Sequence, residues 1–224
     1  AGPQSRAVLQ KLVDHDLSTA AFPFMSFAQM DVGMVPALVG RVSFTGEMGY
    51  EMWVTSEYLR TLYDLLHEAG KAHGLKNFGG RALNSLRLEK SFGNWAREFR
   101  PIYGPYEAGL GRFVHLDKPD FIGKSAAATE KASGGVRKLV TLAVDAKDAD
   151  AIGDEPIWHG DKVVGWVTSG GYGHAVGKSI ALGYVDNAVA GETDGFAVEL
   201  LGERRAAVRS AEALFDPKGL RMRT

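Results

Sequence analysis

The sequence predicts an α+β fold in which a region of helices and strands is followed by a small antiparallel β-barrel or sandwich. Before about residue 133, segments with apolar side chains at 3.6-residue spacing alternate with strand-like stretches. After it, the short runs VRKLVTLAV, KVVGWVTSGGYG, KSIALGYV, FAVEL and RRAAVRSA are separated by Gly, Asp and Asn, and no long amphipathic helix occurs. The composition changes at Ser133–Gly135, which predicts a boundary between domains 1–133 and 134–224.

The first domain is expected to begin with a helix over residues 3–15. Pro3 suits the first turn of this helix, where a missing N–H costs nothing. Between Phe24 and Thr55 the chain is rich in Val, Phe, Met and Trp and is punctuated by glycines, so two or three strands are expected there. The apolar residues with helical spacing in the first segment are Val8, Leu9, Leu12 and Val13.

A second helix is expected over residues 56–73, with Ser56 as its N-cap and Gly74 at its end. Its apolar stripe consists of Leu59, Leu62, Tyr63, Leu66 and Ala69. The remaining segments expected before the boundary are a helix over 81–90, a loop-rich stretch over 91–120 and a short helix over 123–131.

Composition and charge exclude several classes of function. Hydrophobic residues make up 45% and charged residues 24% of the 224, an ordinary globular balance. The formal net charge is -1 and no basic run occurs, so neither nucleic acid nor an anionic membrane surface is expected as a partner. The apolar runs are far shorter than the roughly 20 residues that span a bilayer.

The chain has no cysteine, which excludes disulfides, thiolate nucleophiles, zinc ribbons and iron–sulfur clusters. Its six histidines show no metal-ligand spacing, so no metal site is expected. The absence of cysteine fits a reducing compartment, and we expect a cytoplasmic location. The first residues, AGPQSRAVLQ, have neither the basic nor the apolar region of a signal peptide, and they resemble a chain already inside a helix. We therefore expect the chain to be part of a longer protein.

Two glycine-rich motifs do not fit known phosphate-binding patterns. The residue before GHAVGKS is Tyr172, and the phosphate loop requires its first glycine at this position. GGYGHAVG has three residues instead of two between Gly173 and Gly177, so it does not match the dinucleotide fingerprint. A strand–turn–strand hairpin is the better interpretation of this segment. No GxSxG nucleophile motif occurs.

The segment RVSFTGEMGYEMW, from Arg41 to Trp53, is the first candidate site. Gly46 and Gly49 bracket a tight turn, after which strand alternation places Tyr50 and Met52 on one face and Glu51 and Trp53 on the other. One interpretation is a solvated Glu51 in a hairpin. The other is a site for a planar heterocycle such as a pterin, whose adjacent N–H donors match the two oxygens of a carboxylate. The rings that offer stacking area are Phe44, Tyr50 and Trp53.

A second marker is ALNSLRLEKSFGNW, from Ala82 to Trp95. Arg87 and Glu89 cannot both be solvated on one helix face with Leu86 and Leu88 between them. We expect a buried or half-buried ion pair with a structural role.

Five motifs occur in one order along nearly the whole chain: RVSFTGEMGYE, SLRLEKSFGNW, PYEAGLGRFV, DFIGKSA and FDPKGLRMR. Together they resemble the aminomethyltransferase family, which comprises the glycine-cleavage T-protein and the folate-binding C-terminal modules of dimethylglycine and sarcosine dehydrogenases. SLRLEK followed by Trp95 and EFRPIYGPYEAGL is more similar to the dehydrogenase modules. The resemblance implies a folate-binding α/β region, of which this chain holds part, followed by a small β-barrel domain.

The resemblance also implies roles for single residues. The carboxylate of the family's GYE triplet holds the pterin, and this position is Glu51. A family tyrosine that lines the folate pocket corresponds to Phe44, which keeps the ring and loses the hydroxyl. In T-proteins an Arg that helps bind substrate precedes an Asp, and here these positions are Leu83 and Asn84, which argues against the T-protein branch. The iron–sulfur-assembly branch carries a cysteine that this chain lacks.

The implied function is that of a tetrahydrofolate-binding one-carbon-transfer module. We expect it to be the C-terminal part of a flavin-dependent enzyme that oxidises an N-methyl amine and captures the one-carbon unit as methylene-tetrahydrofolate. The alternatives are a stand-alone aminomethyltransferase and a non-catalytic folate-binding or interaction module. The resemblance places the catalytic Asp upstream of this chain and FAD only in a further N-terminal domain. The chain alone is therefore expected to be inactive, and an exposed sheet edge is expected to favour self-association.

Overall fold

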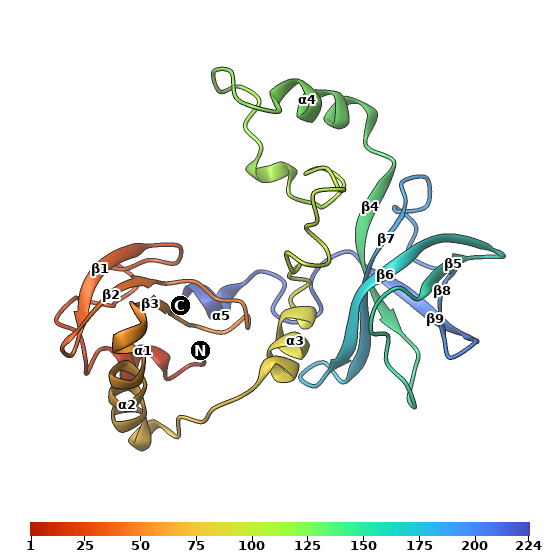
Figure 1. Ribbon diagram of the computed structural model, residues 1–224. Coiled ribbons are helices and arrows are strands. Elements are labelled where there is room, and N and C mark those ends of the chain that lie inside the picture. Colours follow the sequence, from red (N-terminus) through yellow and green to blue (C-terminus); the bar gives the residue numbers. More distant parts are fainter. The chain divides into compact units, whose positions relative to one another are not determined.

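A computed structural model describes residues 1–224 (Figure 1). The chain forms two compact units, one of residues 1–86 together with 216–224, and one of residues 87–215. The first unit contains helices and a three-stranded sheet, and the second contains a closed six-stranded barrel. The α+β fold with a small antiparallel barrel is therefore confirmed. Because the segment 87–133 shares a compact unit with the barrel, the domain boundary at residue 133 stays a prediction.

The sheet of the first unit is antiparallel, with strand order β1–β2–β3. Its strands are β1 (Phe27–Val32), β2 (Val35–Gly40) and β3 (Glu51–Trp53), which agrees with the two or three strands expected. One face packs against helices α1 (Ser5–Leu9) and α2 (Leu59–Gly70), where Val39 of β2 lies in a core with Leu9 and Leu62 (Figure 1). The other face is open, and three of its apolar side chains are exposed: Phe27, Leu38 and Trp53.

Helix α1 (Ser5–Leu9) is much shorter than the helix expected over residues 3–15. The side chain of Gln10 supplies the reason. Its Nε2 donates to the carbonyl oxygens of Val13 (3.3 Å) and His15 (2.9 Å), and its Oε1 accepts the N–H of Leu17 (2.9 Å). These bonds give the backbone an alternative to the helical pattern, so the prediction was wrong beyond residue 9.

The second helical segment has the expected extent. It consists of the short 3-10 turn η1 (Ser56–Tyr58), helix α2 (Leu59–Gly70) and the 3-10 turn η2 (Lys71–His73). It ends at Gly74, whose φ of 67° is in the left-handed region, as predicted. The N-cap is Thr55 and not Ser56, which is the first residue of η1. Leu62 is buried, whereas Leu59 and Tyr63 of the predicted stripe are exposed.

The following segments match their predictions within a few residues. Helix α3 (Gly80–Glu89) is followed by a loop-rich stretch with one 3-10 turn, η3 (Gly111–Phe113), and by helix α4 (Lys124–Ser133). A last short helix, α5 (Leu220–Arg223), belongs to the first unit. None of these helices has the length and apolar character needed to cross a lipid bilayer.

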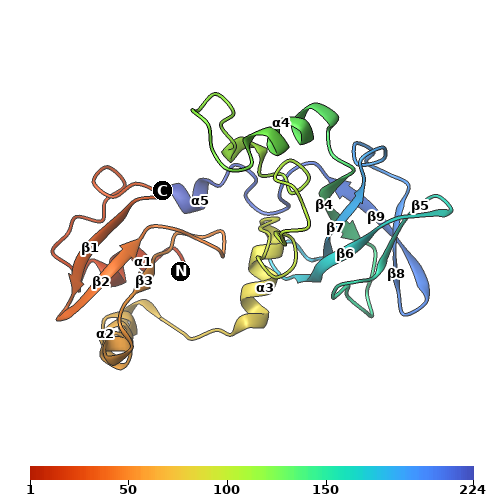
Figure 2. The ribbon, with the colours of Figure 1, turned by 45° about the horizontal axis from the view of Figure 1, so that its top comes forward.

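The barrel is antiparallel throughout and closes in the order β4-β7-β6-β5-β8-β9 (Figure 2). Its interior is filled by apolar residues such as Leu142, Ile157 and Val198, which are all fully buried. Gly173 pairs with Lys178 at the end of the β6–β7 hairpin, so the hairpin predicted for GHAVGKS is confirmed. The strands are β4 (Arg137–Val144), β5 (Pro156–His159), β6 (Lys162–Gly173), β7 (Lys178–Asp186), β8 (Phe196–Leu200) and β9 (Glu203–Ser210).

A buried ion pair is present in the second unit, although its partner differs from the one expected. Arg87 Nη1 donates to Glu98 Oε2 at 3.1 Å, and both side chains are almost fully buried. Glu89 is also buried, but its Oε1 accepts the backbone N–H groups of Ala175 (2.6 Å) and Val176 (3.3 Å). The sequence showed that both charges needed partners, but it did not show that Glu98, from a loop, supplies the carboxylate for Arg87.

The carboxylate of Glu98 is fully satisfied by hydrogen bonds. Besides Arg87, it accepts the N–H of Asn94 (2.7 Å) and the hydroxyl groups of Thr168 and Ser169 (2.5 Å each). The backbone carbonyl of Glu98 accepts the hydroxyl of Tyr184 at 2.7 Å. This network fastens the loop after α3 to barrel strands β6 and β7.

Candidate functional site

Strand β3 presents its side chains alternately to the two faces of the sheet. Tyr50, just before the strand, and Met52 are half-buried and pack on the helix-covered core. Glu51 and Trp53 lie on the open face and are exposed. The predicted alternation is confirmed, and β3 therefore separates two surfaces that a single ligand group cannot contact together.

On the open face, two aromatic rings lie across a glycine. Gly40 pairs with Phe27 of β1 on one side and with Glu51 of β3 on the other. A Cβ atom at Gly40 would lie 2.4 Å from the Phe27 ring and 3.0 Å from the Trp53 ring, so only glycine leaves room for both. The ring centroids are 5.8 Å apart with an interplanar angle of 31°.

Both rings retain much of their exposure, at 49% for Phe27 and 45% for Trp53. An exposed aromatic pair on a sheet face offers apolar area to a flat ligand. The carboxylate of Glu51 beside this pair makes no hydrogen bond or ion pair within the chain. We call Glu51, Phe27 and Trp53, together with Gly40, the open-face cluster.

The loop over residues 41–50 leads into Glu51 and is held by local contacts. Gly46 has a φ of 84°, and its N–H donates to the Ser43 hydroxyl at 3.1 Å. Glu47 forms an ion pair with Arg221 of α5 (2.6 Å). Phe44 lies half-buried in this loop, outside β3. The loop thus fixes the chain direction before the strand that carries Glu51.

Arg41 anchors the start of the same loop. Its side chain is fully buried, and Nη1 donates to the carbonyl oxygen of Phe22 at 2.8 Å, while Nη2 donates to that of Thr224. Burial lowers the pKa of the Arg41 guanidinium below its ordinary value, and the positive charge of Arg6 acts in the same direction. Its position on the covered side of the sheet makes Arg41 a structural group.

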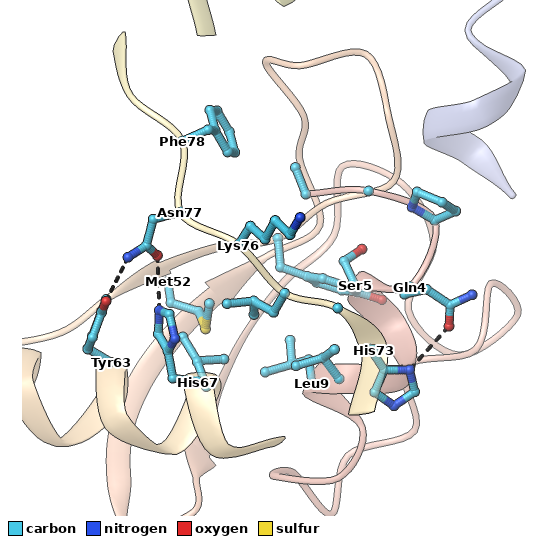
Figure 3. Close-up of a pocket in the computed structure, with 18 residues that line it drawn as sticks. Gln4, Ser5, Leu9, Met52, Tyr63, His67, His73, Lys76, Asn77 and Phe78 are labelled. Carbon is cyan, nitrogen blue, oxygen red and sulfur yellow. Dashed lines mark hydrogen bonds between the residues drawn. The ribbon is translucent and has the colours of Figure 1, made fainter. Parts of the chain in front are cut away.

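The helix-covered side of β3 borders a cavity of about 700 Å³ (Figure 3). The 3-10 turn η2 ends at His73 and is capped by Gly74, and the N–H of Leu75 then bonds back to the carbonyl of Gly70 (3.1 Å), which turns the chain around. The residues after this turn run back along α2, so Asn77 meets both Tyr63 and His67. Tyr50 is the one predicted site residue that lines this cavity.

The structure therefore divides the four residues predicted as a cofactor site. Glu51 and Trp53 lie together on the open face, Tyr50 stacks on Phe22 on the covered side, and Phe44 lies in the preceding loop. Phe27 belongs with Glu51 and was not predicted, since it lies far away in sequence. Only the register of β1 against β2 shows that Phe27 and Glu51 flank the same glycine. The structure contains no cluster of three or more His, Asp or Glu side chains able to hold a metal ion.

Comparison with known proteins shows the family of this chain. Residues 1–118 match the profile of the GCVT N-terminal domain, and residues 137–216 match that of the glycine cleavage T-protein C-terminal barrel domain. The chain belongs to the glycine cleavage T-protein family. The family resemblance of the five sequence motifs is thereby confirmed.

Relatives of this T-protein-family chain include larger enzymes. It is 44% identical over 215 residues to human mitochondrial dimethylglycine dehydrogenase, and 34% identical over 230 residues to human mitochondrial sarcosine dehydrogenase. These matches cover 96% and 99% of the chain, but only 25% of each relative. An aminomethyltransferase from Caldanaerobacter subterraneus is 37% identical over 186 residues, which cover 83% of the chain and 49% of the relative.

A solved relative supports the fold of the T-protein-family chain. The crystal structure of glycine cleavage system aminomethyltransferase T from Bartonella henselae matches with a TM-score of 0.81 and 26% sequence identity. The match covers 96% of the chain and 58% of that structure. The chain thus spans about a quarter of the length of the dehydrogenases it matches. Because those dehydrogenases are mitochondrial, a cytoplasmic location stays a prediction.

Proposed function

We propose that the chain is a tetrahydrofolate-binding one-carbon-transfer module of a flavin-dependent enzyme similar to dimethylglycine and sarcosine dehydrogenases. The observation that carries this proposal is the open-face cluster, in which an unpaired carboxylate stands beside two exposed rings. Family membership and 44% identity to a dimethylglycine dehydrogenase support it. FAD in a further domain and an N-methyl amine as the source of the one-carbon unit belong to the same proposal.

The open-face cluster fits a pterin ring chemically. The ring has adjacent N–H donors, and an ionised carboxylate accepts two parallel hydrogen bonds from such a pair. Glu51 has both oxygens available for these bonds because no side chain of the chain occupies them. The rings of Trp53 and Phe27 provide the stacking area, and Gly40 keeps the space between them open.

The contribution of these residues is to position the ligand. Tetrahydrofolate supplies the amine nitrogen that accepts the one-carbon unit. Glu51 fixes the orientation of the pterin end, and the aromatic rings exclude water from one of its faces. No residue of the chain is assigned a catalytic role. Phe44 remains a proposed contact from the loop before β3, whereas Tyr50 lies on the far side of the strand from Glu51.

An aminomethyltransferase without a flavin domain is the second candidate. The 37% identity to such an enzyme favours it. Leu83 and Asn84 of α3 replace the Arg and Asp that T-proteins carry at these positions, which favours the dehydrogenase type. Oxidation of dimethylglycine or sarcosine by the intact parent protein, with formation of methylene-tetrahydrofolate, distinguishes the two enzymes.

The binding proposal is tested by calorimetric titration of the chain with tetrahydrofolate. We expect Glu51→Gln to weaken binding about tenfold, equivalent to about 1.4 kcal/mol. Asp31→Asn is the matched control, since Asp31 is an exposed acid on the same sheet face at the opposite end of β1. Equal affinities for the wild type and Glu51→Gln would contradict the assignment of Glu51 as the pterin anchor.

Self-association and inactivity of the isolated chain remain proposals. Strands β1 and β3 each have one unpaired edge, and such edges favour pairing between chains. Light scattering over a range of concentrations tests this proposal, and a monodisperse monomer would contradict it. A turnover assay with the isolated chain tests its inactivity.

A further inference from the structure

The loop between barrel strands β7 and β8 contains the single Asp–Gly pair of the chain, Asp194–Gly195, and the chain has no Asn–Gly pair. Both residues are exposed, and the Asp194 carboxylate makes no hydrogen bond or ion pair within the chain. A glycine has no side chain to shield its backbone nitrogen from the preceding side chain. This nitrogen is therefore free to attack the side-chain Cγ of the Asp and to close a five-membered ring.

The peptide group that joins Asp194 to Gly195 makes no hydrogen bond, whereas the carbonyl groups on either side of it are held. The carbonyl oxygen of Thr193 accepts the N–H of Arg209 at 2.9 Å. That of Gly195 accepts the N–H of Gly160 at 3.1 Å. Neither the carbonyl of Asp194 nor the N–H of Gly195 has a partner within the chain. Rotation of this one peptide group therefore breaks no hydrogen bond, and the chain on both sides stays in place.

Position 195 requires a glycine for two reasons. Its φ of 84° lies in the left-handed region, which disfavours residues with a side chain. A Cβ atom at this position would also lie 2.9 Å from Nε2 of His159. The imidazole ring of His159 packs against Phe196, with ring centroids 4.9 Å apart. The local fold thus keeps an unshielded backbone nitrogen directly after Asp194.

We propose that Asp194–Gly195 is a site of spontaneous isoaspartate formation in the folded chain. The Gly195 nitrogen attacks Cγ of the protonated Asp194 carboxyl group, so an N–Cγ bond forms and the bond from Cγ to the hydroxyl oxygen breaks. The hydroxyl group leaves with the proton of the nitrogen as water, which yields a succinimide ring. Water then adds to the main-chain carbonyl carbon of Asp194, and the bond from this carbon to the nitrogen breaks. The main chain afterwards runs through Cβ and Cγ of the former Asp194.

The reacting atoms belong to two adjacent residues, and water is both released and consumed. No oxidant or reductant takes part, because the oxidation state of each carbon is unchanged. The reaction also needs no docked partner, so it depends only on the conformation of this loop.

The rearrangement lengthens the main chain by one carbon directly before β8. Strand β8 lies between β5 and β9 in the barrel (Figure 2). Its first residue, Phe196, is buried and pairs with His159 of β5 and Ala207 of β9. On the other side of the pair, Thr193 is bonded to Arg209. The added carbon must be accommodated between these two fixed points, so we expect isoaspartate to weaken the pairing at the start of β8.

The test is prolonged incubation of the 224-residue chain at neutral pH and physiological temperature, followed by tryptic digestion and mass spectrometry with electron-transfer fragmentation. The isoaspartyl peptide has an unchanged mass and distinct backbone fragments, and the succinimide is lighter by one water. Residues 179–204 form one tryptic peptide, which also contains Asp186 as an internal control. We expect isoaspartate at residue 194 and none at Asp186, because Asn187 shields the nitrogen that follows Asp186.

Two conservative variants assign the product to Asp194. Asp194→Glu should lose the product, because the longer side chain would have to close a six-membered ring, which forms much more slowly. Asp194→Asn should form the same succinimide faster and release ammonia, because an uncharged amide is attacked more readily than an ionised carboxylate. Asp194 is exposed and unpaired, so neither change is expected to affect folding.

Urea distinguishes a reaction of the folded loop from one that requires unfolding. Rotation of one exposed peptide group uncovers little surface, so the rate should not depend on urea below the unfolding transition. A rate that rises steeply with urea in this range would overturn the proposal. It would also be overturned if the isolated peptide 179–204 formed isoaspartate and the folded chain did not, or if Asp186 or the Asp194→Glu variant gave an equal yield. None of these measurements involves tetrahydrofolate, so their outcome is independent of the proposed function.

Discussion

Glu51 lies directly opposite Gly40 where β3 pairs with β2. This register brings the proposed pterin anchor next to the one position on the sheet where a side chain is excluded by the rings of Phe27 and Trp53. The positions of the Glu51 carboxylate and of the two rings thus depend on a single cross-strand pair. A substitution of Gly40 therefore perturbs the site without removing any of its functional groups.

Gly40→Ala is expected to weaken tetrahydrofolate binding about tenfold while the fold is retained. The new methyl group would lie 2.4 Å from the Phe27 ring, so this ring must move. Because the ring is half-exposed and can rotate away, the free energy of unfolding should change by less than about 1 kcal/mol. Calorimetry and urea unfolding measure the two effects. Gly79→Ala is the control, as a Cβ there meets nothing within 4 Å, and equal effects at the two glycines would refute the prediction.

Trp53→Leu should weaken tetrahydrofolate binding by about 1–3 kcal/mol, the range found when an aromatic partner of a stacked base is removed. Quenching of Trp fluorescence by the ligand should also decrease in this variant. Trp95→Leu serves as the control, because Trp95 is 82% exposed and belongs to the second unit. If Trp95→Leu removed the quenching and Trp53→Leu did not, the site would have to be placed elsewhere.

Glu98→Gln should destabilise the second unit by about 3 kcal/mol or more, because it removes the negative charge that pairs with the buried guanidinium of Arg87. Desolvation lowers the pKa of Arg87, while the charge of Glu98 and its hydrogen bond act in the opposite direction. Urea unfolding followed by far-UV circular dichroism gives the free energy. The control is Asp154→Asn, which breaks the exposed ion pair with Arg97 and is expected to cost less than about 0.5 kcal/mol. A similar loss of unfolding free energy in both variants would contradict the role of burial in the Arg87–Glu98 pair.

Alkaline pH should weaken the barrel through Tyr184. Burial raises the pKa of the Tyr184 phenol above its ordinary value, so the folded chain holds this proton more tightly than the unfolded chain. The stabilisation is therefore complete below the ordinary pKa of about 10, and it is lost as the pH rises through the higher folded value. The difference in unfolding free energy between wild type and Tyr184→Phe should shrink between pH 8 and pH 11. With Tyr58→Phe, whose phenol is exposed, the difference should stay near zero, and a constant gap for Tyr184 would exclude this linkage.

The spacing of apolar residues in the sequence was sufficient to predict most of the helices and strands. Five of the six barrel strands, the segment from Ser56 to Gly74 and the helices α3 and α4 have strong local patterns, and they occur where these patterns predict. Strand β5 (Pro156–His159) was not predicted. Helix α1 does not continue as predicted because the amide of Gln10 bonds to three backbone groups that follow it. A competing side-chain hydrogen bond of this kind does not change the spacing of the apolar residues, so this spacing cannot predict it.

Pairs of residues that are distant in sequence were not predictable in the same way. Local alternation placed Glu51 and Trp53 on one face correctly, but it gave no information about β1, which supplies Phe27. Likewise, the burial of Arg87 was expected, whereas its pairing with Glu98 depends on how a loop folds back on the barrel. Both relationships are set by tertiary contacts, and a single sequence taken alone carries no signal for such contacts.

Residues 216–224 return to the first unit after the whole barrel has been traversed, and there Arg6 and Arg41 both donate to the carbonyl of Thr224. During synthesis on a ribosome, the buried guanidinium of Arg41 therefore keeps an unpaired donor until residues 216–224 have emerged. The barrel, being contiguous in sequence, can form while this happens. We expect the order of folding to differ from the order of translation, because the barrel can close before the first unit is completed.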